Sequence, residues 1–272
     1  MVAGRASQIT RQTIETSDGV TLSLLEVGRD RRSALTIVVV PGWLMPAALW
    51  RNQLEAWGKH FPALAMDPRG QGESEVARGG YTAERRATDI KEVLEPLSNV
   101  LIVGWSLGAI DALQYIHMFG DRKLAGLALV DSSVGEEPAP PPGESFLQAL
   151  REDRDRTLEN FVRAIFTTPR TESEVAALVA GAKRLSVEDS IALLSYPFPR
   201  THWNDIVHRF TKPLLYAVTP QYEEQARNLQ QRRPATKVEI FRRAGHALFA
   251  DEPGRFNRLI ESFARRLPLM PR

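Results

Sequence analysis

Hydrophobic residues in this chain form short runs that alternate with amphipathic segments. Residues 9–28 alternate apolar and polar positions on either side of Ser17-Asp18-Gly19, which is typical of two strands joined by a tight turn. Later apolar runs lack this alternation and are typical of strands buried on both faces. These runs lie at residues 34–40, 61–67, 99–104, 124–131, 212–218 and 237–241.

Segments with helical periodicity separate most of these runs. In residues 47–60 and 82–97, apolar side chains recur at the spacing of one helix face. Strands that alternate with helices predict an α/β fold, with a mostly parallel sheet covered on both faces and the N-terminal hairpin at its start.

The alternation fails once, between residues 132 and 211. This segment opens with the proline-rich stretch 135–144, which favours an extended connection, and continues as helical segments. We therefore expect a core formed by residues 1–131 and 212–272, with residues 132–211 inserted as a helical cap.

Composition and charge exclude several classes of protein. With 272 residues, 43% of them hydrophobic, the chain is long enough to bury a large core. The net charge is only +2 and the basic clusters are short and scattered, so we expect no nucleic-acid partner. The chain has no cysteine, which excludes disulfides and thiol nucleophiles. The N-terminal residues lack an apolar signal region and no apolar run could span a bilayer, so we expect a cytoplasmic protein without a membrane partner.

A serine stands between two glycines where a predicted strand meets a predicted helix. Gly104-Trp105-Ser106-Leu107-Gly108 is a G-x-S-x-G pentapeptide in the strand–turn–helix context that separates this motif from chance matches. The close approach of strand and helix requires small residues on both flanks, and the corner lifts the serine above the carboxyl ends of the strands. Ser106 is therefore a candidate nucleophile, and the Leu107 amide can point at a developing oxyanion.

A serine hydroxyl is a weak nucleophile unless a base takes its proton. His246 follows the last predicted strand, on a loop at a carboxyl end and ahead of an amphipathic C-terminal helix. It is the candidate base. We interpret the other histidines as solvated or capping residues: His60, His117, His202 and His208.

Together these segments resemble the capped α/β-hydrolase-fold serine hydrolases of the esterase, lipase and haloperoxidase-like type. The resemblance rests on VVVPGWLMPAALW, MDPRGQGES, GWSLG and AGHALFADEPGRFN, in this order. It implies an eight-stranded sheet, a small-molecule ester substrate, and neither a metal nor a cofactor. It also assigns the second oxyanion amide to Trp43, after Pro41-Gly42. Relatives often have His-Gly there, but the donor is a backbone N–H, so the proline should not remove the oxyanion hole.

The position of the triad acid departs from the family pattern. The family usually carries an aspartate after the strand that follows the cap, where this chain has Tyr222. Asp131 is one alternative, because some relatives, including haloalkane dehalogenases, take the acid from that strand end, which also borders the histidine loop. Glu223 or Glu224 is another, and a serine–histidine pair without an acid is the third.

The sequence favours a serine carboxylesterase that hydrolyses short- to medium-chain esters through an acyl-enzyme intermediate. The aromatic residues expected to bind the substrate are Trp105, Phe166, Phe198 and Trp203. Carbon–carbon bond hydrolysis, acyl transfer, perhydrolysis and hydrolysis of acyl-carrier esters use the same triad and stay as alternatives. A non-catalytic ligand-binding receptor is an alternative from another class.

An acyl carrier protein is a possible partner. The oxyanion loop and the elbow resemble those of the pimeloyl-carrier methyl esterases of biotin synthesis, and the insertion carries arginines that could meet an acidic carrier: Arg151, Arg154, Arg156, Arg163 and Arg170. Acidic residues interspersed among them favour instead ion pairs on a solvated helix face.

Overall fold

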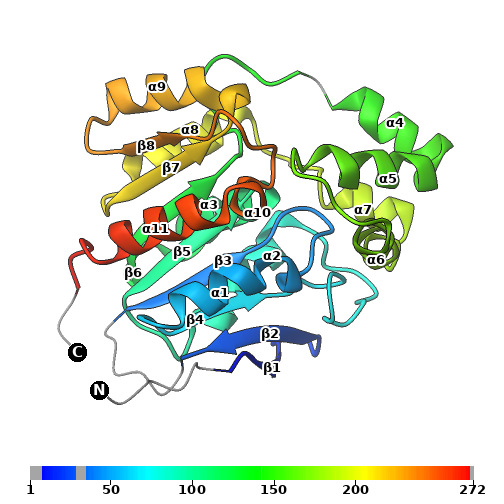
Figure 1. The fold of residues 1–272 in the computed structure, drawn as a ribbon, viewed down its shortest axis with the longest axis horizontal. Coiled ribbons are helices and arrows are strands. Elements are labelled where there is room, and N and C mark those ends of the chain that lie inside the picture. The colour runs from blue at the N-terminus through cyan, green and yellow to red at the C-terminus, as the bar shows by residue number, and fades with distance from the viewer. Residues whose placement is uncertain (1–7, 29–34, 142, 270–272) are drawn as a thin grey trace.

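One eight-stranded sheet forms the centre of the computed structural model, which describes residues 8–28, 35–141 and 143–269 (Figure 1). The spatial order of the strands is β1-β2-β4-β3-β5-β6-β7-β8. The strands are β1 (Thr10–Glu15), β2 (Thr21–Val27), β3 (Thr36–Val40), β4 (Ala63–Met66), β5 (Val100–Trp105), β6 (Leu124–Val130), β7 (Leu214–Val218) and β8 (Lys237–Ile240). The β1–β2 and β2–β4 pairs are antiparallel and all others are parallel, which confirms the predicted sheet and its N-terminal hairpin.

Helices cover both faces of this sheet. In Figure 1, α1 (Arg51–Trp57) and α11 (Pro253–Ala264) run side by side across the front of the sheet. Helix α3 (Leu107–Phe119) packs against α2 (Ala83–Leu94), and α9 (Glu223–Arg232) contacts β7 and β8. Short elements complete the core: η1 (Ala47–Trp50), η2 (Pro220–Tyr222) and α10 (Leu248–Asp251). In the described ranges, no helix is both long enough and apolar enough to cross a membrane.

The insertion between β6 and β7 is helical, as its pattern predicts, but its helices do not stay together. Its elements are α4 (Glu144–Glu152), α5 (Arg154–Ala164), α6 (Glu172–Ala182), α7 (Val187–Ala192) and α8 (Arg200–Arg209). Helices α4 to α7 gather at one end of the molecule in Figure 1, whereas α8 packs against α3 in the core layer. Within the segment expected to be the cap, the group of helices that stands apart from the sheet is therefore α4–α7.

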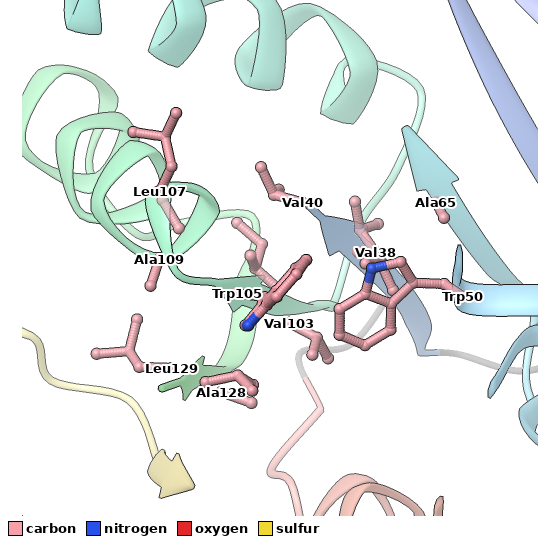
Figure 2. Packing of buried hydrophobic residues seen from close by; sticks show 14 of the residues in the cluster. Val38, Val40, Trp50, Ala65, Val103, Trp105, Leu107, Ala109, Ala128 and Leu129 are labelled. Carbon is pink, nitrogen blue, oxygen red and sulfur yellow. The ribbon is translucent and has the colours of Figure 1, made fainter. Parts of the chain in front are cut away.

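An aromatic cluster joins distant parts of the chain beneath the carboxyl edge of the sheet. Trp50 stacks on Phe249 with ring centroids 3.6 Å apart, and it meets the edge of Trp105 at 6.3 Å. Figure 2 shows Trp50 and Trp105 among small aliphatic side chains of the central strands. Burying an aromatic ring stabilises the fold by about 1.5–3 kcal/mol. The cluster therefore fixes η1, the end of β5 and the segment after His246 relative to one another.

Candidate active site

Ser106 is the corner residue between β5 and α3. Its backbone has φ 55° and ψ −118°, an unfavourable conformation for a side-chain-bearing residue that persists only where neighbouring structure holds it. Its N–H donates to the Val130 carbonyl at 2.9 Å. A Cβ atom at Gly108 would lie 2.1 Å from the Val40 oxygen, and one at Gly104 would lie 2.6 Å from the oxygen of Gly108. The two glycines are therefore required by close packing around the corner.

The structure brings Asp131 to His246, with 2.8 Å between Oδ2 of the aspartate and Nδ1 of the histidine. Asp131 follows β6 and is fully buried, and its φ is 44°. Its Oδ1 accepts hydrogen bonds from the backbone N–H of Thr219 at 2.6 Å and from the Thr219 hydroxyl at 2.8 Å. One carboxylate oxygen is thus held by the end of β7, while the other faces the imidazole.

The two glutamates considered as alternative acids lie elsewhere. The carboxylate of Glu223 binds the Arg242 guanidinium through bonds of 2.6 and 2.8 Å, and it also pairs with Arg227. The hydrogen bond with Arg242 is the main reason why the pKa of Glu223 is lowered. Glu224 is exposed in the first turn of α9. The residue in contact with the histidine is therefore Asp131.

The indole of Trp105 supports the histidine loop. Its Nε1 donates to the backbone carbonyl of His246 at 2.8 Å, and the two rings lie 5.3 Å apart between centroids. Trp105, which precedes the candidate nucleophile Ser106, therefore helps to hold the loop of the candidate base His246 in place.

The loop after β3 passes directly over Ser106. A Cβ atom at Gly42 would lie 3.1 Å from the Ser106 Cβ, so the backbone that leads into Trp43 is held against the serine. The Trp43 side chain donates from Nε1 to the Ser190 carbonyl at 2.7 Å. On the other side, Leu107 is the first residue of α3, and its N–H has no acceptor within the helix.

A cavity of about 250 Å³ opens beside Ser106. Its walls come from α3, from the segment after β6 and from the insertion, and they include Leu107, Ile110, Ser132, Ser133, Tyr196 and Trp203. No described residue that lines the cavity is acidic. Tyr222 also reaches it, and burial, followed by the charge of Asp131, raises the pKa of Tyr222 to about 12. The cavity therefore offers apolar walls and neutral hydroxyl groups next to the serine, together with one cationic side chain, Arg200.

Comparison with known proteins identifies the family. The profile described as "Alpha/beta hydrolase family" matches residues 37–259. The chain belongs to the alpha/beta hydrolase family. It is 26% identical over 261 residues to the pimeloyl-[acyl-carrier protein] methyl ester esterase of Citrobacter koseri, an alignment covering 85% of this chain and 94% of that protein.

Two solved structures superpose over almost the whole chain. The esterase EaEST from Exiguobacterium antarcticum has a TM-score of 0.80 at 22% identity, covering 93% of this chain and 99% of that one. A bromoperoxidase from Bacillus anthracis has a TM-score of 0.81 at 20% identity, covering 95% of this chain and 100% of that one. At these identities the likeness establishes the shared fold.

Of the aromatic residues expected to bind the substrate of this alpha/beta hydrolase, Trp203 lines the cavity and the others do not. Trp105 is 1% exposed and packs under the histidine loop instead. Phe198 stacks on His202 with centroids 4.3 Å apart. Phe166 lines a separate surface pocket and lies beneath the Arg170 guanidinium. The helical pattern of the insertion predicts its helices and not the direction in which Phe166 and Phe198 point.

Sequence reasoning also missed residues that shape this site. Thr219 orients the Asp131 carboxylate, and its only signal was a hydroxyl residue directly after a buried strand. Tyr222 stands in the sequence where the family usually has an acid, and this position alone does not predict that it lines the cavity. Within the described part of the chain, no three His, Asp or Glu side chains are grouped so that they could hold a metal ion.

Proposed function

We propose that this alpha/beta hydrolase is a serine carboxylesterase that acts on short- to medium-chain esters through an acyl-enzyme intermediate. The observation that carries the proposal is the 2.8 Å contact between Asp131 and His246. The strained Ser106 lines a cavity, and its neighbour Trp105 binds the His246 carbonyl. Family membership and the esterase named among the relatives also support an ester-hydrolysing enzyme.

In the proposed mechanism, Ser106 Oγ attacks the ester carbonyl while His246 takes its proton. Asp131 holds the proton on Nδ1 of the imidazole, which leaves Nε2 free to accept. The backbone N–H groups of Trp43 and Leu107 stabilise the tetrahedral oxyanion, an interaction whose single donors are worth about 3–4 kcal/mol in other serine hydrolases. His246 then protonates the leaving alcohol, and a water molecule activated by the same histidine releases the carboxylic acid.

The size of the cavity supports a preference for small substrates. Sites for drug-sized ligands occupy about 300–1,000 Å³, whereas this cavity measures about 250 Å³. Leu107 and Ile110 form an apolar wall next to the serine, which suits a short acyl or alcohol group. We therefore expect kcat/KM to peak at short or medium chains in a series from acetyl to palmitoyl esters. A steady rise toward palmitoyl, with activation at an oil–water interface, would instead indicate a lipase with a mobile lid.

Labelling of the nucleophile tests the mechanism. A fluorophosphonate should modify one residue, Ser106, as located by mass mapping, and Ser106→Ala should abolish turnover and labelling. Ser133→Ala is the matched control, since its hydroxyl lines the same cavity but donates to Gln225 at 3.0 Å. Labelling elsewhere, or full turnover by Ser106→Ala, would refute the proposal.

A carrier-bound ester is a second candidate substrate, favoured by the pimeloyl-[acyl-carrier protein] methyl ester esterases among the relatives. The arginines expected to meet a carrier give it mixed support. Arg154 donates to the Ala182 and Leu185 carbonyls, and Arg163 pairs with Glu159 and Glu172.

Arg151 and Arg156 are exposed, so their charges can attract an acidic carrier protein. The test compares kcat/KM for the methyl ester of one acyl group attached to an acyl carrier protein and attached to a small thiol. A loss of any carrier preference in Arg151→Gln and Arg156→Gln would support this candidate. Equal rates on both substrates in the unmodified enzyme would exclude it.

A further inference from the structure

The loop that carries His246 is bound by the segment that joins α5 to α6. The N–H of Ala247 donates to the Ile165 carbonyl at 2.7 Å. The hydroxyl oxygen of Thr167 lies 3.0 Å from the carbonyl oxygen of Arg243, within hydrogen-bond distance. The segment between α5 and α6 therefore contacts the histidine loop both before and after His246.

The Asp251 carboxylate accepts hydrogen bonds from both of these segments. Its side chain is 1% exposed, and its Oδ2 accepts from the N–H of Gly245 at 2.8 Å and from the N–H and hydroxyl of Thr167, both at 2.9 Å. Its Oδ1 accepts from the N–H and the hydroxyl of Thr168. One carboxylate thus satisfies donors from the histidine loop and from the insertion together.

The hydrogen bonds keep this buried carboxylate ionised. Burial acts to raise the pKa of Asp251, but bonds from Thr168, Thr167 and Gly245 outweigh it and hold the pKa below its usual value. The donors surround both oxygens, so an uncharged amide could not replace the carboxylate: its NH₂ group would face donors on one side.

The two segments also approach closely at Gly245, where only a glycine fits. A Cβ atom at Gly245 would lie 2.8 Å from the Ile165 carbonyl oxygen and 3.1 Å from the carbonyl carbon of Phe166. The histidine loop is therefore packed backbone against backbone on this segment.

We propose that Asp251 is a positioning residue for His246. It fixes the histidine loop against the segment between α5 and α6, so that the imidazole stays aligned with Asp131 and with Ser106. The inference rests on the proposed function, because it assigns His246 the role of base. A displacement of about 1 Å at a reacting group can reduce a rate about 100-fold.

The test measures the reactivity of Ser106 with and without the Asp251 carboxylate. For Asp251→Asn we expect about a 100-fold lower rate of fluorophosphonate inactivation and of kcat on p-nitrophenyl acetate, with KM changed by no more than about threefold. Asp155→Asn is the matched control, since this carboxylate also belongs to the insertion but is exposed and pairs with Lys183. The control should match the unmodified enzyme in each measurement.

A milder variant covers the case in which Asp251→Asn does not fold. Thr167→Val preserves the shape of the side chain and removes the hydroxyl that donates to Asp251 and lies within hydrogen-bond distance of the Arg243 carbonyl. It should lower the inactivation rate in the same direction, by about tenfold.

An unchanged inactivation rate in folded variants would overturn the positioning role, as would a rise of KM alone, because the segment would then shape only substrate binding. Failure of the unmodified enzyme to label at Ser106 would overturn the proposed function itself. The two failures are therefore distinguished before any variant is compared.

Discussion

Replacement of Asp131 by asparagine tests the contact on which the proposed mechanism depends. The backbone tolerates the change, because φ is 44° at this position and Asn, like Asp, is enriched in the left-handed region. The neighbours also determine how the new amide must lie. Both the N–H and the hydroxyl of Thr219 donate to Oδ1, so the amide oxygen stays there and the NH₂ group faces His246.

This orientation gives the magnitude of the effect. Turning the amide round would set its NH₂ group against two donors, and each buried group left unpaired costs about 1–3 kcal/mol. In the favoured orientation the amide donates to Nδ1 of His246, which leaves the ring proton on Nε2. The imidazole then cannot accept the Ser106 proton, and in the best-studied triads this tautomer lowers kcat by about 10⁴. That loss corresponds to about 5 kcal/mol of activation free energy.

The assay is kcat/KM on p-nitrophenyl acetate, with melting curves to confirm that each variant is folded. Asp121→Asn is the matched control, because this residue lies between α3 and β6 at the opposite edge of the sheet. Glu223→Gln and Glu224→Gln should retain near-normal activity. If Asp131→Asn keeps near-normal activity while Glu223→Gln or Glu224→Gln loses it, the triad acid is that glutamate, after the end of β7. Near-normal activity of all three would mean that a serine–histidine pair suffices.

Three further substitutions test the surroundings of the site. Trp105→Phe keeps an aromatic ring but removes the bond to the His246 carbonyl, so we expect a loss of about 1–3 kcal/mol in unfolding free energy and a lower kcat, measured by melting curves and ester hydrolysis. Gly108→Ala sets a methyl group 2.1 Å from a backbone oxygen of β3, which should reduce kcat/KM by about 100-fold. Gly181→Ala, which has open space around it in α6, should leave activity unchanged and is its control. Trp203→Leu enlarges the cavity and should shift the chain-length optimum toward longer esters; an unchanged optimum would show that the acyl chain binds elsewhere.

The fold could be predicted from the sequence where the pattern is local. Continuous apolar runs predict the buried strands, because a strand covered on both faces has no polar side to reveal. The packing of α8 on α3 could not be predicted, since α8 has the same helical pattern as its neighbours in the insertion. Amphipathicity indicates that a helix has an apolar face, and it does not indicate which element that face meets.

In the candidate site, too, residues defined by a local motif could be predicted, whereas residues defined by tertiary contacts could not. Ser106 was identifiable because the strained corner and its two glycines lie within five residues. Asp131 could only be named as one of several acids, since its contact with His246 spans 115 positions in the sequence. Asp251 follows His246 by five residues, yet its role depends on Thr167 in the insertion, which no local pattern connects to it.

The position of the acid also affects what the cavity can contain. If β6 supplies the carboxylate through Asp131, the end of β7 no longer needs to supply one, and it contributes Thr219 to orient that carboxylate instead. The place of the family's usual acid is then free for Tyr222, which lines the cavity as a neutral phenol with its pKa raised to about 12. A phenol there can donate a hydrogen bond to a substrate oxygen, whereas a second carboxylate would repel the developing oxyanion and the acid product. Moving the acid from β7 to β6 therefore converts a position that serves the histidine into one that can recognise the substrate.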